Sequence, residues 1–64
     1  MKEIVEMYRR MAAVQRASAK EWRAMALDAP DAFAFLMLRN AEANDMQAAA
    51  DESRADKIEN PQRN

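Results

Sequence analysis

One apolar row repeats every seven residues in each half of the chain, which is the spacing of one face of a helix. Its members are Val5, Ala12, Ala19 and Ala26 in the first half, and Ala34, Ala41, Ala48 and Ala55 in the second. Pro30 separates the halves, and it disfavours helical angles at the residue before it. We therefore expect a helix over about 3–27, a turn at 28–30, a second helix over about 30–58, and a flexible tail at 60–64 after a single domain at 1–59.

When the second helix folds back on the first about Pro30, each member of one row faces a member of the other, and the residue numbers of every facing pair sum to 60. The same register places Gln15 opposite Asn44 and Tyr8 opposite Asp51. On one flank it predicts that Lys2, Arg9 and Arg16 face Glu59, Glu52 and Asp45, with Arg23 opposite Leu38. Agreement between independent residue classes indicates a specified fold. The sequence predicts an all-α, antiparallel two-helix hairpin with an alanine-rich seam, which would dimerise into a four-helix bundle. We expect Asp28 and Asp31 to supply cap oxygens and negative charge at the start of the second helix.

A second apolar surface remains once the seam is assigned, and we call it the Met-rich face. It comprises Ile4, Met7, Met11, Val14, Ser18 and Met25 of the first helix, and Phe33, Leu36, Ala43 and Ala50 of the second. An exposed apolar surface on a small protein marks an interaction site. A second copy of the chain could cover it, and so could a different, larger protein. We predict that the interface uses Met7, Met11, Val14, Met25, Phe33, Phe35, Leu36 and Leu38.

Composition argues against several classes of chemistry. The 64 residues include no cysteine, histidine or glycine, so disulfides, the usual zinc ligands, the commonest general base and glycine-rich phosphate loops are all excluded. We expect no catalytic, cofactor-binding or metal-binding residues and no small-molecule substrate. No segment approaches the roughly 18 apolar residues of a membrane span, which favours a cytoplasmic protein without membrane association.

Nucleic-acid binding is the alternative function. Lys2, Arg9, Arg16, Lys20 and Arg23 form a basic ridge along the first helix that could follow phosphates. In length and predicted layout the chain resembles the plasmid-encoded Rop proteins, which are RNA-binding dimers of helical hairpins. The resemblance is architectural and carries no shared motif. The net charge of −1 and the predicted acidic partners of three ridge residues disfavour this function. We predict instead a small accessory protein that acts as a non-catalytic regulator, adaptor or inhibitor by occupying a partner's surface.

Overall fold

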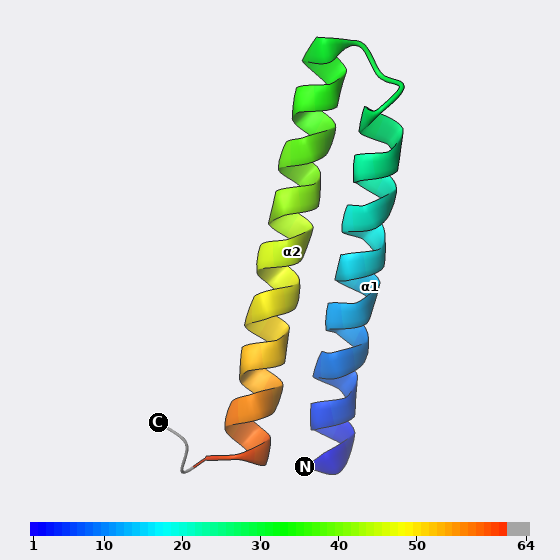
Figure 1. Ribbon diagram of the computed structural model, residues 1–64. Coiled ribbons are helices and arrows are strands. Elements are labelled where there is room, and N and C mark those ends of the chain that lie inside the picture. Colours follow the sequence, from blue (N-terminus) through cyan, green and yellow to red (C-terminus); the bar gives the residue numbers. More distant parts are fainter. Residues whose placement is uncertain (62–64) are drawn as a thin grey trace.

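The computed structural model describes residues 1–61 and consists of two helices that pack against each other. Helix α1 spans Lys2–Ala26 and helix α2 spans Asp31–Glu59. They run antiparallel as a hairpin, so that the start of α1 and the end of α2 lie together, opposite the connecting turn (Figure 1). No strand occurs among the described residues. The prediction of an all-helical hairpin is thus confirmed. Residues 62–64 of the predicted flexible tail lie outside the part that is described.

The turn differs from the prediction in how α2 begins. Pro30 is the residue before the helix rather than its first member, with φ −56° and ψ 150°. Its carbonyl oxygen accepts hydrogen bonds from the backbone N–H groups of Phe33 and Ala34, at 2.9 and 2.8 Å. No side chain caps α2, so the predicted cap oxygens of Asp28 and Asp31 are wrong. Asp31 lies in the first turn of α2, where its negative charge interacts favourably with the helix dipole.

Apart from Asp51, the buried side chains are small apolar ones along the line where the helices meet. These buried apolar residues, which we call the buried row, are Val5, Ala12, Ala19, Ala41, Ala48 and Ala55. Near the turn, Ala26 and Ala34 are only half-buried. One valine contributes three side-chain carbons to this row and each alanine contributes one. Because the hydrophobic gain follows the apolar area removed from water, so small a core provides little driving force.

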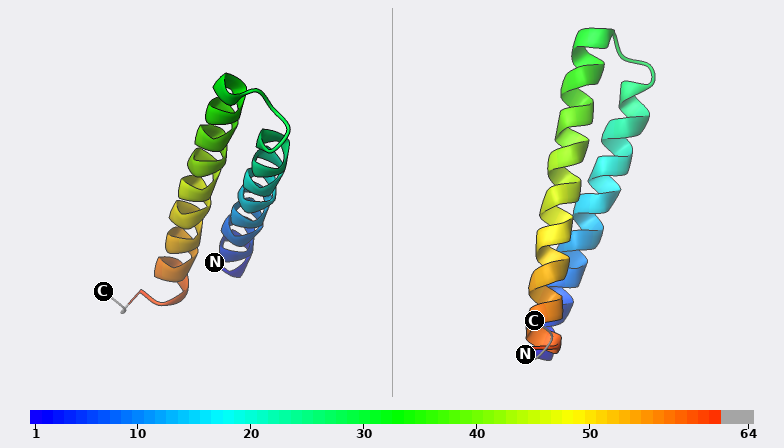
Figure 2. Two further views of the ribbon diagram at one scale, coloured as in Figure 1. Left: turned by 45° about the horizontal axis from the view of Figure 1, so that its top comes forward. Right: turned by 60° about the vertical axis from the view of Figure 1, so that its left-hand side comes forward.

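The hairpin is a single layer, one helix thick. Its Cα atoms extend over 47 × 21 × 10 Å, and the views in Figure 2 show two rods without a second layer over either broad side. Helical domains normally bury an apolar stripe against a second layer. Neither helix is long and apolar enough, within the described part, to cross a membrane.

Candidate interaction surface

Most large apolar side chains of this protein lie on its outside, and Trp22, Met37 and Ile58 are half-buried. Twelve of them are exposed among the described residues, by 41% to 86% of their surface. All eight predicted interface residues belong to this set. They are Met7, Met11, Val14, Met25, Phe33, Phe35, Leu36 and Leu38. The bulk that could form a core is therefore at the surface, while the interior holds alanine.

Three members of the Met-rich face form one groove along α1. Met7, Met11 and Val14 line it together with Arg10 and Gln15. Their spacing by three and four residues places them on one side of the helix. Methionine is flexible and polarisable, which suits an apolar surface that adapts to another protein. The structure thus brings these three predicted interface residues together in one groove, which could accept an apolar surface of another protein.

A second apolar cluster lies near the turn. Leu27 is the most exposed large apolar residue, at 86%, and Phe35 and Leu38 are also exposed. The guanidinium of Arg39 lies 5.7 Å from the centre of the Phe35 ring, which is within the range of a cation–π contact. Phe35 therefore already has one favourable neighbour within the chain.

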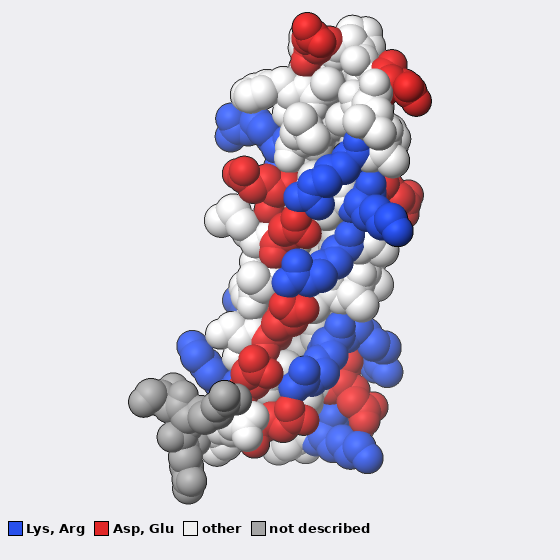
Figure 3. All heavy atoms as spheres, in the orientation of Figure 1, with Lys and Arg blue, Asp and Glu red and all other residues white. Residues whose placement is uncertain are grey.

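The opposite side of the hairpin, which we call the charged flank, consists of paired ions. Figure 3 shows basic side chains reaching from α1 across the junction to acidic side chains of α2. Arg16 makes two hydrogen bonds to Glu52, at 3.1 and 2.6 Å, and lies 3.7 Å from Asp45. This hydrogen bond to Arg16 holds the pKa of the Glu52 carboxyl below its ordinary value and raises the pKa of Arg16.

The pairing on this flank is displaced by one heptad from the prediction. Arg9 bonds Glu59 rather than Glu52, and it also lies 3.4 Å from Asp56. Arg23 bonds Asp45 rather than facing only Leu38. Of the three predicted ion pairs, only Arg16 with Asp45 is present among the described residues.

Side-chain direction explains the displacement. Helical side chains lean toward the N-terminus of their own helix. In an antiparallel hairpin the two leans are opposed: Arg9 reaches toward the chain ends, and Glu59 reaches toward the turn. The two groups meet between their backbone positions. At the same level, Arg9 and Glu52 diverge, and Arg16 lies 3.7 Å from Asp45, farther than its 2.6 Å bond to Glu52.

Two polar positions inside the hairpin behave differently from each other. Asn44 donates a 2.5 Å hydrogen bond to the side-chain oxygen of Gln15, as the predicted register requires. Asp51 is 1% exposed, and one of its oxygens accepts bonds from Arg54 at 2.9 Å and Gln47 at 3.4 Å. Its other oxygen, Oδ2, has no partner within the described residues. The predicted meeting of the Tyr8 hydroxyl with Asp51 is thus not a hydrogen bond there.

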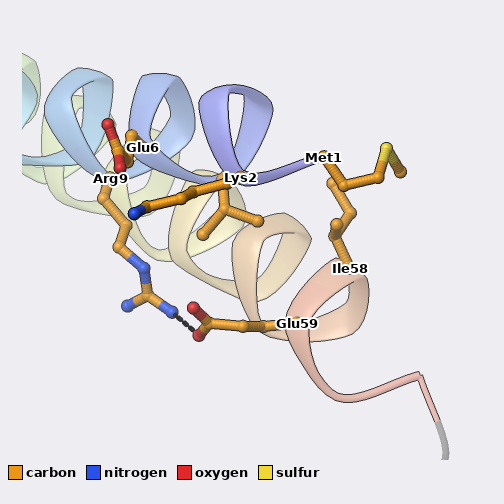
Figure 4. Close-up of a pocket in the computed structure, with 7 residues that line it drawn as sticks. Met1, Lys2, Glu6, Arg9, Ile58 and Glu59 are labelled. Carbon is orange, nitrogen blue, oxygen red and sulfur yellow. Dashed lines mark hydrogen bonds and ion pairs between the residues drawn. The ribbon is translucent and has the colours of Figure 1, made fainter.

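The open end of the hairpin carries a shallow pocket. Its lining includes Val5, Ile58 and the ion pair of Arg9 with Glu59 (Figure 4). Sequence reasoning missed this pocket, although Val5, Arg9 and Glu59 belong to rows that it identified, because matching residues by level does not show where the surface is hollow. Its charged lining also includes Lys2 and Glu6. Within residues 1–61 there is no group of three or more acidic side chains that could hold a metal ion.

The basic ridge proposed for nucleic acid is largely engaged within the chain. Arg9, Arg16 and Arg23 all bond acidic side chains of α2. Lys2 and Lys20 form no ion pair in the described part of the chain. Phosphates would therefore compete with carboxylates for three of the five ridge residues. The chain matches no protein-family model, no curated protein and no solved structure.

Proposed function

We propose that this protein is a non-catalytic interaction module that acts through the Met-rich face, with the alanine-rich seam serving to hold the two helices together. One observation carries the proposal: most large apolar side chains are exposed, and the buried ones are small. A surface of this kind is unfavourable in water and becomes favourable when a partner covers it. The chain would regulate, adapt or inhibit by occupying a surface of another protein chain, and pairing of two hairpins into a four-helix bundle is the simplest form of such an interaction.

The charged flank supports the choice of face. Its arginines and carboxylates satisfy one another within the hairpin. Exposed ion pairs of this kind contribute only about 0 to 1 kcal/mol each, so their main effect is on alignment of the helices. Covering them with another protein would cost desolvation free energy. The Met-rich face carries no such cost over its apolar residues.

Matched substitutions test the proposal. Met11→Glu places a charge in the α1 groove, whereas Met46→Glu makes the same change at an exposed position outside the Met-rich face. Each variant and the wild-type chain would serve as bait in cross-linked pull-downs from the source cells, with captured proteins quantified by mass spectrometry.

The proposal expects that Met11→Glu loses captured partners, including any second copy of the chain, and that Met46→Glu retains them. Circular dichroism would verify that both variants keep their helices. Equal capture by all three baits would show that the Met-rich face is not the interaction site.

A further inference from the structure

The partner that covers the Met-rich face can be identified from area, residue size and charge. We propose that it is a second copy of this chain, related by a twofold axis along the hairpin so that both turns lie at the same end. This inference rests on the proposed use of the Met-rich face. It adds the occupant and its orientation.

The hairpin exposes more surface than a compact chain of its mass. A compact monomer of 7.3 kDa is expected to expose about 4,200 Å², and this chain exposes 5051 Å². An interface of standard size removes about 800 Å² from each partner, and the broad side of the single-layer hairpin, 47 × 21 Å, is large enough to supply it.

The symmetry determines which residues meet. Rotation about an axis along the hairpin leaves each residue at its own level, so α1 lies over α2 of the second copy in the register of the hairpin itself. Met11 then comes level with Ala50 of the second copy, which places a large side chain against a small one. At the turn, Met25 comes level with Leu36 of the second copy, next to Phe33. Met11 thus finds a small residue and Met25 an apolar cluster, which is how packed layers interdigitate, while Ile4 and Met7 come level with Lys57 and Arg54 of the second copy at the open end.

Charge distribution favours the same orientation. Glu21 comes level with Arg39 of the second copy, and Glu3 comes level with Lys57. None of Glu21, Arg39 and Lys57 is in an ion pair in residues 1–61, and Glu3 has only the chain's amino terminus, at 3.9 Å. These charges could therefore pair between copies at the rim of the interface. Symmetry would produce each pair twice.

The opposite orientation, with the turn of one copy at the open end of the other, is less favourable. In that arrangement α1 lies over α1 and α2 over α2. Phe33 and Leu36 would then come level with Lys57 and Arg54 of the second copy, which in the favoured orientation come level with the smaller Ile4 and Met7. The cluster of Met25, Leu36 and Phe33 would not form.

Cysteine cross-linking distinguishes the orientations, and the absence of native cysteine makes every cross-link informative. A disulfide requires Cα atoms about 4.4 to 6.8 Å apart. We expect that Met11→Cys and Ala50→Cys chains, mixed under mild oxidation, form a mixed disulfide dimer that neither variant forms alone. Met46→Cys is the control and should not be trapped. A mass tag on one of the two variants distinguishes the mixed disulfide dimer from dimers of a single variant.

A charge-reversal cycle provides a second readout. Glu21→Lys should weaken self-association about three- to tenfold, since surface ion pairs are individually weak and two are lost. Adding Arg39→Glu in the same chain should restore it. Sedimentation equilibrium over a dilution series measures both changes.

A self-cross-link of Val14→Cys without the mixed disulfide would overturn the orientation, because Val14 meets its own copy only when the turns lie at opposite ends. A monomer at all concentrations would overturn the dimer. In either case, loss of captured partners by Met11→Glu would still support the proposed function, so the two failures are separable.

Discussion

The two sides of this hairpin differ in whether their interactions are completed within one chain. On the charged flank, Arg9, Arg16 and Arg23 each reach an acidic side chain of α2. On the Met-rich face, Met7, Met11 and Val14 line an open groove. Both sides have strong periodic patterns in the sequence, yet only one pattern is satisfied by the fold. The unsatisfied side is where function is to be sought.

Both sides depend on the buried row between them, and overpacking that row should have the largest effect. Ala19 is fully buried, so Ala19→Leu forces the helices apart and should lower the free energy of unfolding by about 3 kcal/mol. Ala17→Leu, at an exposed position of the same helix, is the control and should change it little. Urea unfolding followed by circular dichroism measures the difference. Equal stability of the two variants would show that the helices do not pack closely at Ala19.

Asp51 offers an increase in stability instead of a loss. Its carboxylate is buried, and one of its oxygens has no partner among the described residues; an unsatisfied buried polar group is destabilising. Asp51→Leu removes that group and places an apolar side chain between the helices, while Arg54, which is half exposed, returns to water. We expect the free energy of unfolding to rise by about 1 to 2 kcal/mol. Glu42→Leu, which adds the same side chain at an exposed site, should not reproduce the gain in urea unfolding. A loss of stability in Asp51→Leu would mean that the carboxylate is needed in the interior.

A reversed charge on the charged flank should lower the stability of the hairpin, whereas a charge placed in the groove should weaken self-association. Arg16→Glu places a third negative charge beside Glu52 and Asp45, and it should lower the melting temperature by a few degrees. It should leave self-association unchanged, because the charged flank lies outside the proposed interface. Met11→Glu should weaken self-association, and its melting temperature should fall only as far as dimerisation stabilises the fold. Thermal melts and sedimentation equilibrium on both variants measure the two properties, and a loss of association in Arg16→Glu would contradict the assignment of the faces.

Sequence reasoning was successful where backbone spacing decides the outcome. The hairpin and the contact of Gln15 with Asn44 follow from helical periodicity and the position of Pro30. It failed where side-chain reach decides. The displaced pairing of Arg9 with Glu59 depends on the direction in which long side chains lean. The hydrogen bond from Arg54 to Asp51 joins two residues of the same helix. Neither is visible when residues are matched by level alone.

The smallest effect concerns pH, and it again separates the two sides. Because the folded-state pKa of Glu52 lies below its ordinary value, the carboxylate of Glu52 contributes stability above that ordinary value, and the contribution disappears as the pH falls through the lowered pKa. Glu52→Gln should therefore melt slightly below wild type at neutral pH and equal to it in strong acid. High salt should narrow the neutral-pH difference by screening. Melting curves across pH and salt measure this, and a difference that persists in strong acid would show that Glu52 acts through packing rather than through its charge. Self-association through the apolar groove should not depend on Glu52 at any pH, so a parallel change in dimer affinity would break the separation between the two sides.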